Sequence, residues 1–594
     1  MPEKPSSQRY LVCVAWPYAS GDRHLGHVAG AYLPPDIYAR YQRLRGNDVR
    51  MVSGSDTHGT PVMLRAQEEG VTPQEIVARY HGRFVESFKA LGLSFDLFTH
   101  TDTQNHWDTV QELFLNHLDN GYIYKDKQLQ PYCLIDEQYL ADRFVEGTCP
   151  HCGYEHARGD QCDNCGSPLD PIELIHPRCK ICGQDKIEFR ETEHFFFDLG
   201  KASPALAEWL NEDKEHWRPH VINYARQQAE SGELRGRAVT RDIDWGINVP
   251  VEGYEDKVIY VWYDAVIGYL SATREAMLLE GAPEAWKDWW FDRDVKSVYF
   301  IGKDNIPFHA IFWPAVLIAD GRGMNLPYDV PANAYLNIED KKISTSRRWT
   351  IDLPDFLSRY DPDPLRYALT INAPETRDVN FTWEEFLRRN NEELVATWGN
   401  LVNRTVGFAY KRFEGKIPEP GEFDEVDGAL LKESEEAFER VGAEIDAVRL
   451  KIALSKAMEL AHAANRYLNE KAPWAQIKTD PAAAATTIYV TLQVIDRLKV
   501  LLHPFLPFTT QELHKFLGYD DDLFGELTID EIEDARGVHK ALRYDGSGVN
   551  VRWEPATLPA GQALRKPHAL YKKLDPAIVE EERARLQARL GLDG

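Results

Sequence analysis

The stretch RYLVCVAWPYASGDRHLGH, residues 9–27, decides the fold of the first part of the chain. Its valine-rich start at 9–16 has the length of a buried strand and is closed by Pro17. Turn residues follow, and Ser20 or Asp22 can cap a helix. We therefore expect a strand, a turn and a helix whose first turns contain both histidines.

The same succession returns along the chain. Residues 48–56 read as a second strand, followed by a helix from Pro61, and the rhythm recurs at 257–270 and 295–321. Alternating strands and helices are typical of a parallel sheet covered on both faces, so we predict an α/β fold. The double proline at 34–35 should kink or split the first helix, because proline lacks the backbone N–H.

Composition bounds the class of protein. The chain has 594 residues, 43% of them hydrophobic and 27% charged, which indicates a folded protein of several domains. No segment approaches the twenty apolar residues of a membrane helix, so we expect a cytoplasmic protein without a membrane partner. The net charge of −26 argues against non-specific coating of nucleic acid, but it leaves room for a specific nucleic-acid partner on a local basic face.

Changes in composition suggest boundaries along the chain. The segment after the first α/β half holds paired cysteines, and after about residue 390 apolar residues recur at helical spacing. We expect two halves of an α/β domain at 1–120 and 251–335, an insertion at 121–250, a region with a polar loop at 336–390, a helical bundle at 391–535, and a C-terminal extension packing back on the body at 536–594.

Three units of one pattern mark the insertion: CPHCG (149–153), CDNCG (162–166) and CKICG (179–183). Two thiolates two residues apart can grip one metal ion, so Cys149, Cys152, Cys162 and Cys165 suffice for a closed, structural zinc site. Cys179 and Cys182 could bind a second zinc with two further ligands. Alternatively, they could take the place of Cys162 and Cys165 in the first site. The candidate further ligands are His151, His156, His176 and His194.

The other cysteines stand apart from these units. Cys13 lies in a predicted strand and is expected in the core, and nothing in the sequence assigns Cys133.

Two polar motifs suit phosphate. His24 and His27 follow the first strand near a helix N-terminus, a place that attracts anions. Far along the chain, the segment KKISTSRR at 341–348 interleaves basic side chains with hydroxyls, as in a loop that closes on polyphosphate. Taken alone, each motif has a simpler interpretation: a solvated helix face, or a metal pair with Asp22, for the histidines, and a basic surface turn for the second segment.

These motifs lie among others that match one family. GSDTHGTP (54–61), ETEHFFFDL (191–199), VWYDAVIGY (261–269), FIGKDNIPFHAIFWPA (300–315) and APW (472–474) follow in order. Together with the histidine motif and the KISTS segment, they resemble the methionyl-tRNA synthetases, a family of class I aminoacyl-tRNA synthetases, from residue 9 to about 510.

The resemblance implies a fold and an activity. It implies a Rossmann-like parallel sheet interrupted by a zinc-knuckle insertion, followed by an all-α bundle that binds the anticodon. Its members use ATP with Mg²⁺ to convert L-methionine to methionyl-adenylate, and then charge tRNA(Met), including the initiator. Residues 336–390 would form a stem-contact region with the KISTS signature loop, and the protein would bind structural zinc, one ion or two.

The resemblance also implies site residues. The catalytic set would be His24, His27, Lys342, Ser344 and Ser346. ATP would be bound by His24, His27, Gly302, Asp304, Ile338, Lys342 and Thr345. Methionine would be bound by Ala15, Trp16, Tyr18, Asp56, Trp262, Ala265, Tyr269 and His309, with Asp56 on the ammonium group. Asn400, Arg404 and Trp474 would contact the anticodon.

Three positions depart from the family pattern. Thr345 stands where the signature loop has a second lysine, so its charge would be lost or supplied by Lys341, Arg347 or Arg348. Trp16 replaces an aliphatic residue and Val266 a frequent proline, both in the methionine pocket.

Two other functions stay open. One is a class I synthetase for leucine, isoleucine, valine or cysteine, although the insertion here is short for an editing domain. The other is a non-catalytic RNA-binding paralogue. Since no appended dimerisation domain is evident after the bundle, a monomer is expected.

Overall fold

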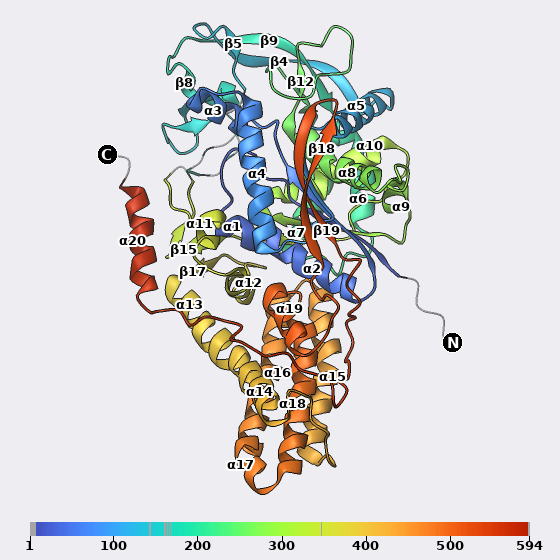
Figure 1. Ribbon diagram of the computed structural model, residues 1–594. Helices are drawn as coiled ribbons and strands as arrows, with labels where there is room; N and C mark the ends of the chain where they lie inside the picture. Colours follow the sequence, from blue (N-terminus) through green and yellow to red (C-terminus); the bar gives the residue numbers. More distant parts are fainter. Residues whose placement is uncertain are drawn as a thin grey trace.

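The computed structural model describes residues 7–141, 144–159, 162, 164–165, 167, 169–345 and 347–591. Figure 1 shows an α/β body, with the cysteine-rich insertion at its upper end and a long helical bundle projecting from its lower end. Across the described residues, no helix has both the length and the apolar composition needed to cross a bilayer.

A seven-stranded sheet forms the centre of the body, in the order β14-β13-β1-β2-β3-β19-β18. The first five strands in this order are parallel, as predicted. Side chains of β1 alternate between two cores: Val12 and Val14 face one, and Leu11 and Cys13 face the other. The strands are β1 Arg9–Val14, β2 Asp48–Ser55, β3 Leu97–His100, β13 Lys296–Gly302, β14 Ala332–Asn333, β18 Glu526–Asp534 and β19 Gly537–Asp545.

The last two strands form a hairpin that the sequence did not predict. β19 runs antiparallel to β3, where Leu542 lies opposite Phe98, and Ala541 and Leu542 are fully buried. The hairpin follows the helical bundle in the chain, so it joins the end of the bundle to the sheet of the body. The boundary expected at residue 535 falls in its turn, between two strands that pair along their whole length.

The first helix is interrupted, as the double proline predicts. A π-helical turn, η1 Val28–Tyr32, separates α1 Leu25–His27 from α2 Leu33–Leu44, and Pro34 and Pro35 stand at the start of α2. The other helices of the body are α3 Thr60–Glu69, α4 Pro73–Leu91, α5 Gln104–Asp119, α8 Val261–Leu279, α9 Lys287–Trp290, η3 Lys303–Asn305, η4 Phe308–Phe312 and α10 Trp313–Asp320.

The insertion is built on two long antiparallel strands, β4 Ile123–Cys133 and β9 Ile187–Phe197, paired over their full length. Small strands carry the cysteine-bearing turns at the far end of this pair. These and the remaining elements are β5 Gln138–Tyr139, β6 Val145–Thr148, β7 Ala157–Arg158, η2 Pro171–Glu173, β8 Ile175–Cys179, α6 Leu199–Leu210, α7 Pro219–Glu230, β10 Arg237–Ala238, β11 Thr240–Arg241 and β12 Val258–Ile259.

Between the body and the bundle lies a connecting region. It contains β15 Leu336–Ile338, β16 Lys341–Lys342, α11 Leu353–Leu357, α12 Pro362–Ile371, β17 Val379–Phe381 and α13 Trp383–Arg388. A fully buried arginine, Arg366 of α12, joins the parts: its Nη2 lies 2.6 Å from Asp36 of α2 and donates to the Pro504 carbonyl. Because a buried charge without its partners is costly, this joint fixes the bundle relative to the body.

The bundle is all-helical, as predicted. Its long helices α15, α16 and α18 pack against one another, and α14 packs on α18. The elements are η5 Arg389–Gly399, α14 Asn400–Arg412, α15 Glu425–Asp446, α16 Leu450–Lys471, α17 Pro473–Thr479, α18 Pro481–Leu502 and α19 Pro507–Phe516. A final helix, α20 Ile578–Leu590, returns to the body and lies beside α13 (Figure 1).

Candidate active site

A cavity of about 520 Å³ opens beyond the carboxyl ends of β1, β2 and β13, where open α/β sheets bind ligands. Most of the residues expected at the active site line it, although they come from distant parts of the chain. From the expected set these are Ala15, Trp16, Tyr18, His24, His27, Asp56, Trp262, Ala265, Tyr269, Gly302, Asp304, His309 and Lys342.

The two histidines form a stacked pair at the start of α1. Their ring centroids are 3.6 Å apart, and each ring nitrogen Nδ1 accepts a backbone N–H of the other residue. Burial, followed by the charge of Arg23, lowers the pKa of His24 to about 3, and burial holds the pKa of His27 well below its usual range. Both imidazoles are therefore neutral at pH 7, and each is left with Nε2 as an N–H donor for phosphate.

The signature loop begins in a tight hairpin. Ile338 pairs with Lys341, and the two residues between them, Glu339 and Asp340, have φ angles of 47° and 60°. Positive φ at both central positions gives a two-residue turn of the type that suits hairpin twist, and it strains residues other than glycine. This turn places Lys342 at the cavity, with its Nζ 5.5 Å from the ring centre of Tyr335.

The loop then closes on itself. Ser344 and Trp349 exchange both backbone hydrogen bonds, at 3.2 and 2.9 Å, and Arg347 Nε donates to Ser344 Oγ. The buried Trp349 ring anchors this closure by donating from Nε1 to the Ile338 carbonyl.

The cavity wall does not include all the expected loop residues. Ser344 and Thr345 lie beyond its lining, the Ile338 side chain is buried in the core, and Ser346 lies outside the described residues. Their parts in ATP binding or catalysis stay predictions.

The end of β13 supplies the other side of the phosphate region. Gly302 ends the strand and Asp304 follows it, with its carboxylate accepting a hydrogen bond from the Tyr335 hydroxyl. Lys303 points to a different partner, Asp378, at 2.7 Å. An acidic side chain just after a parallel strand is well placed to accept hydrogen bonds from a ribose.

Asp56 is a buried carboxyl at the end of the cavity that Trp16 and Tyr269 also line. It is 4% exposed, and its Oδ1 has no hydrogen-bond partner among the described residues. Burial, reinforced by the charge of Asp264, raises the pKa of Asp56 well above its usual range. A carboxyl group in this position is stabilised by a ligand that brings a positive charge.

Aromatic side chains enclose the adjoining space. The Tyr269 hydroxyl lies 2.7 Å from His309 Nε2, and His309 Nδ1 lies 3.0 Å from the Asn305 carbonyl. Since a carbonyl only accepts, Nδ1 carries the proton and Nε2 accepts from Tyr269. Burial lowers the pKa of His309 to about 4, so this wall of the pocket is uncharged.

The indole of Trp16 fills the space between two glycines. A Cβ added at Gly54 would come within 2.3 Å of the ring, and one added at Gly268 within 2.6 Å. The position of the Trp16 ring therefore requires glycine at both sites. The ring limits the depth of the pocket beside Tyr269, and the two ring centres are 6.4 Å apart.

Behind Asp56 lies a buried network that sequence reasoning missed. Asp264 of α8 accepts from His58 Nδ1 at 2.6 Å and from His106 Nε2 of α5, and all three side chains are buried. Burial by itself lowers the pKa of His58, but the charges of Asp264 and Asp102 outweigh it and raise the pKa to about 9. The network ties α8, which carries Trp262, Ala265 and Tyr269, to the loop that carries Asp56.

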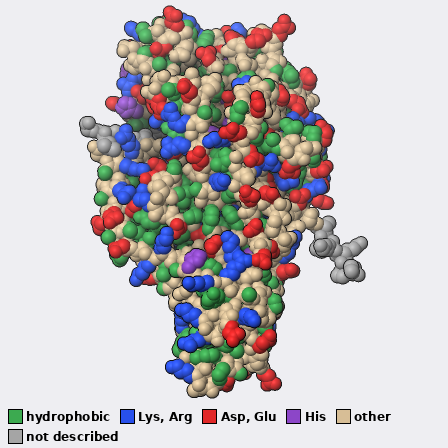
Figure 2. Space-filling model, viewed as in Figure 1, with side chains coloured by type: hydrophobic (Ala, Val, Ile, Leu, Met, Phe, Trp, Pro, Cys, Tyr) green, Lys and Arg blue, Asp and Glu red, His purple; other side chains and the backbone are tan. Residues whose placement is uncertain are grey.

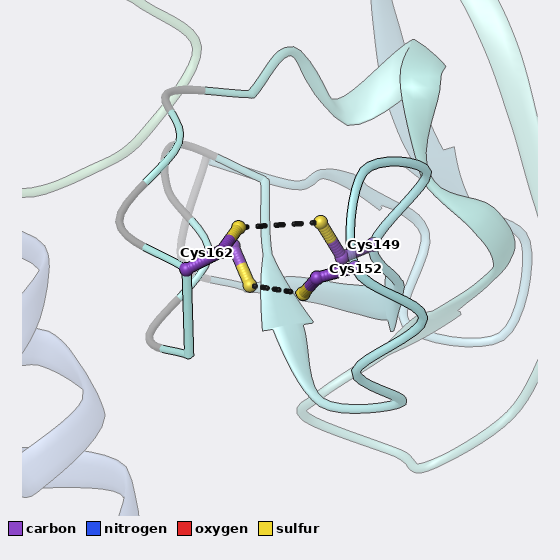
Figure 3. A group of neighbouring side chains, drawn as sticks. Cys149, Cys152 and Cys162 are labelled. Atoms are coloured by element: carbon purple, nitrogen blue, oxygen red, sulfur yellow. Dashed lines mark hydrogen bonds between the residues drawn. The ribbon is translucent and has the colours of Figure 1, made fainter.

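The cysteines form two clusters, each with four possible ligands. Cys149, Cys152, Cys162 and Cys165 meet as predicted, with Sγ–Sγ distances of 3.9 Å for Cys149–Cys165 and 3.6 Å for Cys152–Cys162. Figure 3 shows the labelled side chains of Cys149, Cys152 and Cys162 converging from two turns. This cluster can hold a metal ion. Cys13 is buried in the sheet core, as expected.

The second cluster corrects an expectation. Cys179 and Cys182 are joined by Cys133 and Asp136, not by any of the four candidate histidines. His194, for example, is held elsewhere, 3.1 Å from Asp242 and 2.9 Å from Thr240 Oγ1. The signal was present in the sequence: Cys133 and Asp136 have the two-residue spacing of a knuckle, with a carboxylate in place of the second thiol.

The expected anticodon residues meet near the far end of the bundle. The Arg404 guanidinium lies 4.6 Å above the Trp474 ring and donates to Asn469 Oδ1 at 3.0 Å. Asn400 stands one turn before Arg404 on α14. Trp474 is 41% exposed, so it is not a core residue. On the face in view, Figure 2 shows Lys and Arg side chains among Asp and Glu over the bundle, despite the acidic net charge of the chain.

The fold and the cavity define a class I aminoacyl-tRNA synthetase. A model of the class I tRNA synthetases (M) matches residues 10–406, and a model of the anticodon binding domain of methionyl tRNA ligase matches residues 417–542. The chain belongs to the methionine–tRNA ligase family, whose members are ATP-dependent ligases.

Relatives and solved structures agree with this assignment. A methionine–tRNA ligase of Thermomicrobium roseum is 56% identical over 580 residues, 97% of this chain and 99% of that protein. One of Roseiflexus castenholzii is 50% identical over 591 residues, 98% of this chain and 99% of that protein. The structure of Mycobacterium tuberculosis methionyl-tRNA synthetase bound by methionyl-adenylate has a TM-score of 0.75 at 26% identity, covering 96% of this chain and all of that one.

Proposed function

We propose that the chain activates L-methionine with ATP and transfers the methionyl group to the 3′-terminal adenosine of tRNA(Met), the initiator included. One observation carries the proposal: a single cavity joins the buried carboxyl of Asp56, whose Oδ1 has no partner among the described residues, to the neutral His24–His27 pair and Lys342. Such a cavity can hold an amino acid by its ammonium group and a nucleotide by its phosphates at the same time.

Methionine would lie between Asp56 and the aromatic wall. Its ammonium group would bind the free Oδ1 of Asp56, an oxygen that has no other partner among the described residues. The thioether would pack against Trp16 and Tyr269, since sulfur–aromatic contacts are favourable. The Trp16 ring would favour an unbranched chain, which offsets the departure from the family pattern at this position.

ATP would occupy the other half of the cavity. His24 and His27 would donate to its phosphates, and Gly302 and Asp304 would lie at its ribose. The methionine carboxylate attacks the α-phosphorus in line, and pyrophosphate leaves as negative charge builds on it. Lys342 would stabilise that charge, because the hairpin turn directs it into the cavity. Magnesium bound with ATP would neutralise further phosphate charge.

Zinc suits both cysteine clusters. Four thiolates around Zn²⁺, each about 2.3 Å away, lie about 3.8 Å from one another, close to the 3.6 and 3.9 Å of the first cluster. In the second cluster, three thiolates and the Asp136 carboxylate also give a closed set of four. Neither set leaves a place for substrate, so both ions would be structural.

The bundle would recognise the anticodon of tRNA. An exposed indole beside a guanidinium offers a stacking surface for an unpaired base, with Asn400 and Arg404 near its edges. In this scheme residues 1–120 and 251–335 form the catalytic domain, 121–250 the zinc insertion, 336–390 the stem-contact region, and 391–535 the anticodon domain. Residues 536–594 would support the body.

Amino-acid-dependent ATP–pyrophosphate exchange tests the proposal. Methionine should support exchange at least 100-fold better than leucine, isoleucine, valine or cysteine, and Lys342→Ala should reduce the rate strongly. Exchange with another of these amino acids would assign a different synthetase. Exchange with none of them, in protein that still binds tRNA, would indicate a non-catalytic paralogue.

A further inference from the structure

The C-terminal helix α20 docks against the region that carries the signature loop. Val579, Glu582 and Leu586 form its buried face, at helical spacing, and α13 lies beside it. Glu582 is held by Arg359 at 2.8 Å and by the Tyr360 hydroxyl at 2.9 Å, both just after α11. Figure 1 shows α20 next to α13, on the same side of the body as α11 and β15.

One arginine of this helix meets the start of the loop. Arg583 donates from Nε and Nη2 to Glu339 Oε2, at 2.9 and 2.8 Å, and also reaches Glu384. Glu339 is the first residue of the strained turn that places Lys342, and its other oxygen accepts from the Trp383 backbone at 2.9 Å. The side chain of Glu339 is therefore fully engaged in holding that turn.

A second arginine meets the end of the loop. Arg589 Nη1 donates to the Thr350 carbonyl at 2.9 Å and to Asp352 Oδ2 at 3.0 Å. The backbone here also holds the histidine motif: Leu25 N–H donates to the Ile351 carbonyl at 3.0 Å, and His24 and Asp352 form an antiparallel bridge. Arg589 thus contacts Asp352, the residue whose backbone bridges to His24.

We propose that α20 is a positioning clamp for the activation step: Arg583 fixes the entry of the signature loop and Arg589 its exit, so that Lys342 and His24 keep their separation. Partly exposed ion pairs of this kind contribute little to stability. Placed at the two ends of one loop, two such ion pairs instead control the position of the loop relative to His24. This matters for the rate, because small displacements of reacting groups lower it by large factors. The inference rests on the proposed function, because it needs the loop to act on ATP.

The test compares three variants with a matched control. Arg583→Ala, Arg589→Ala and the double variant remove the clamp, while Arg585→Ala removes an arginine of the same helix that lies 4.0 Å from Glu582. We expect the double variant to lower kcat for ATP–pyrophosphate exchange at least tenfold, with KM for methionine within twofold. Arg585→Ala should stay within twofold of wild type, and Arg589→Lys should recover part of the Arg589→Ala loss.

Active-site titration by adenylate formation separates positioning from folding. Rates are expressed per titrated site, and melting temperatures are recorded for each variant. An unchanged kcat per site in the double variant would overturn the clamp, whether or not the protein melts earlier. A wild-type chain that shows no methionine-dependent exchange would instead refute the proposed function, so the two failures are distinguishable.

Discussion

His58 Nδ1 lies 2.6 Å from Asp264 Oδ2, in a buried position directly behind the cavity that holds Asp56. This contact joins residues 206 positions apart in the chain. It fixes α8, which lines the cavity, to the loop that carries Asp56, the residue proposed to bind the ammonium group of methionine. The pocket therefore owes its shape to groups that touch no substrate.

The His58–Asp264 contact predicts a pH dependence of stability. The pKa of His58 is about 9 in the folded chain, above the 6.5 of an unperturbed histidine, so the folded state binds the extra proton between these values. The stabilisation is complete below about pH 6.5 and is lost as pH rises through about 9. The free energy of unfolding of the wild type should therefore fall more steeply over this window than that of Asp264→Asn. Equal slopes would contradict the assignment.

Asp56→Asn tests the ammonium site. Removing one charge-assisted hydrogen bond, worth about 1.5–3 kcal/mol, should lower kcat/KM for methionine by a factor of about 10 to 150, with KM for ATP changed far less. Steady-state exchange at varied methionine and varied ATP separates the two. The raised pKa of Asp56 also predicts a direction for the pH dependence: methionine binding should weaken as pH falls, because the carboxyl takes up a proton. An equal loss for both substrates would argue against a specific contact.

Metal analysis tests the second cysteine cluster. We expect two zinc ions per chain, because the structure provides two sets of four ligands. Asp136→Ala should lower the zinc content by about one ion while leaving the first cluster loaded. The matched control is His156→Ala, which removes a histidine that lies outside both clusters. One ion per chain in the wild type, unchanged in Asp136→Ala, would refute the second site.

Trp474→Ala tests anticodon recognition. Loss of a base–aromatic stack should weaken tRNA binding by about 1–3 kcal/mol and reduce charging accordingly. Methionine-dependent exchange and the melting temperature should barely change, because the indole is exposed and lies in the bundle, away from the cavity. A parallel loss of exchange and charging, with an early melt, would show a structural role in place of recognition.

The charge missing at Thr345 gives a prediction for the signature loop. If Arg347 or Arg348 replaces the second lysine, neutralising the responsible arginine should slow activation about tenfold, the scale of one lost contact. Arg347 Nε is engaged with Ser344 Oγ at 3.2 Å in the free structure, so its contribution would require the loop to rearrange on ATP binding. Unchanged exchange in both single variants and in the double variant would exclude compensation by either residue.

The residues of the cavity wall were expected from the family resemblance. Local patterns predicted the parallel sheet, the split first helix and the first cysteine cluster. These features depend on period, spacing and proline placement within short stretches, as in the π-helical turn before Pro34. Contacts across long separations were not predictable. The sequence of β18, ELTIDEIED, has too many charged residues to be recognised as a strand of this sheet. Its partner β19 pairs with β3, which lies more than 400 residues earlier in the chain.

The missed ligand and the missed network show the same limit. The two-residue spacing of Cys133 and Asp136 is visible in the sequence, but Asp136 is one of 94 aspartates and glutamates, and only the fold shows that it lies 3.0 Å from Cys179 Sγ. Asp264 is part of a recognisable motif, but nothing local shows that its two oxygens accept hydrogen bonds from His58 and His106.

The central claim is that one cavity holds the ammonium group of methionine at Asp56 and the phosphate of the nucleotide at His24 and His27. Calorimetric binding of a stable methionyl-adenylate analogue measures this most directly. The account predicts that the analogue binds at least 100-fold more tightly than methionine or AMP alone, and that Asp56→Asn and the His24→Ala, His27→Ala pair each weaken it at least tenfold. The claim would be contradicted if the analogue bound no more tightly than methionine or AMP alone, or if a leucyl-adenylate analogue bound equally well.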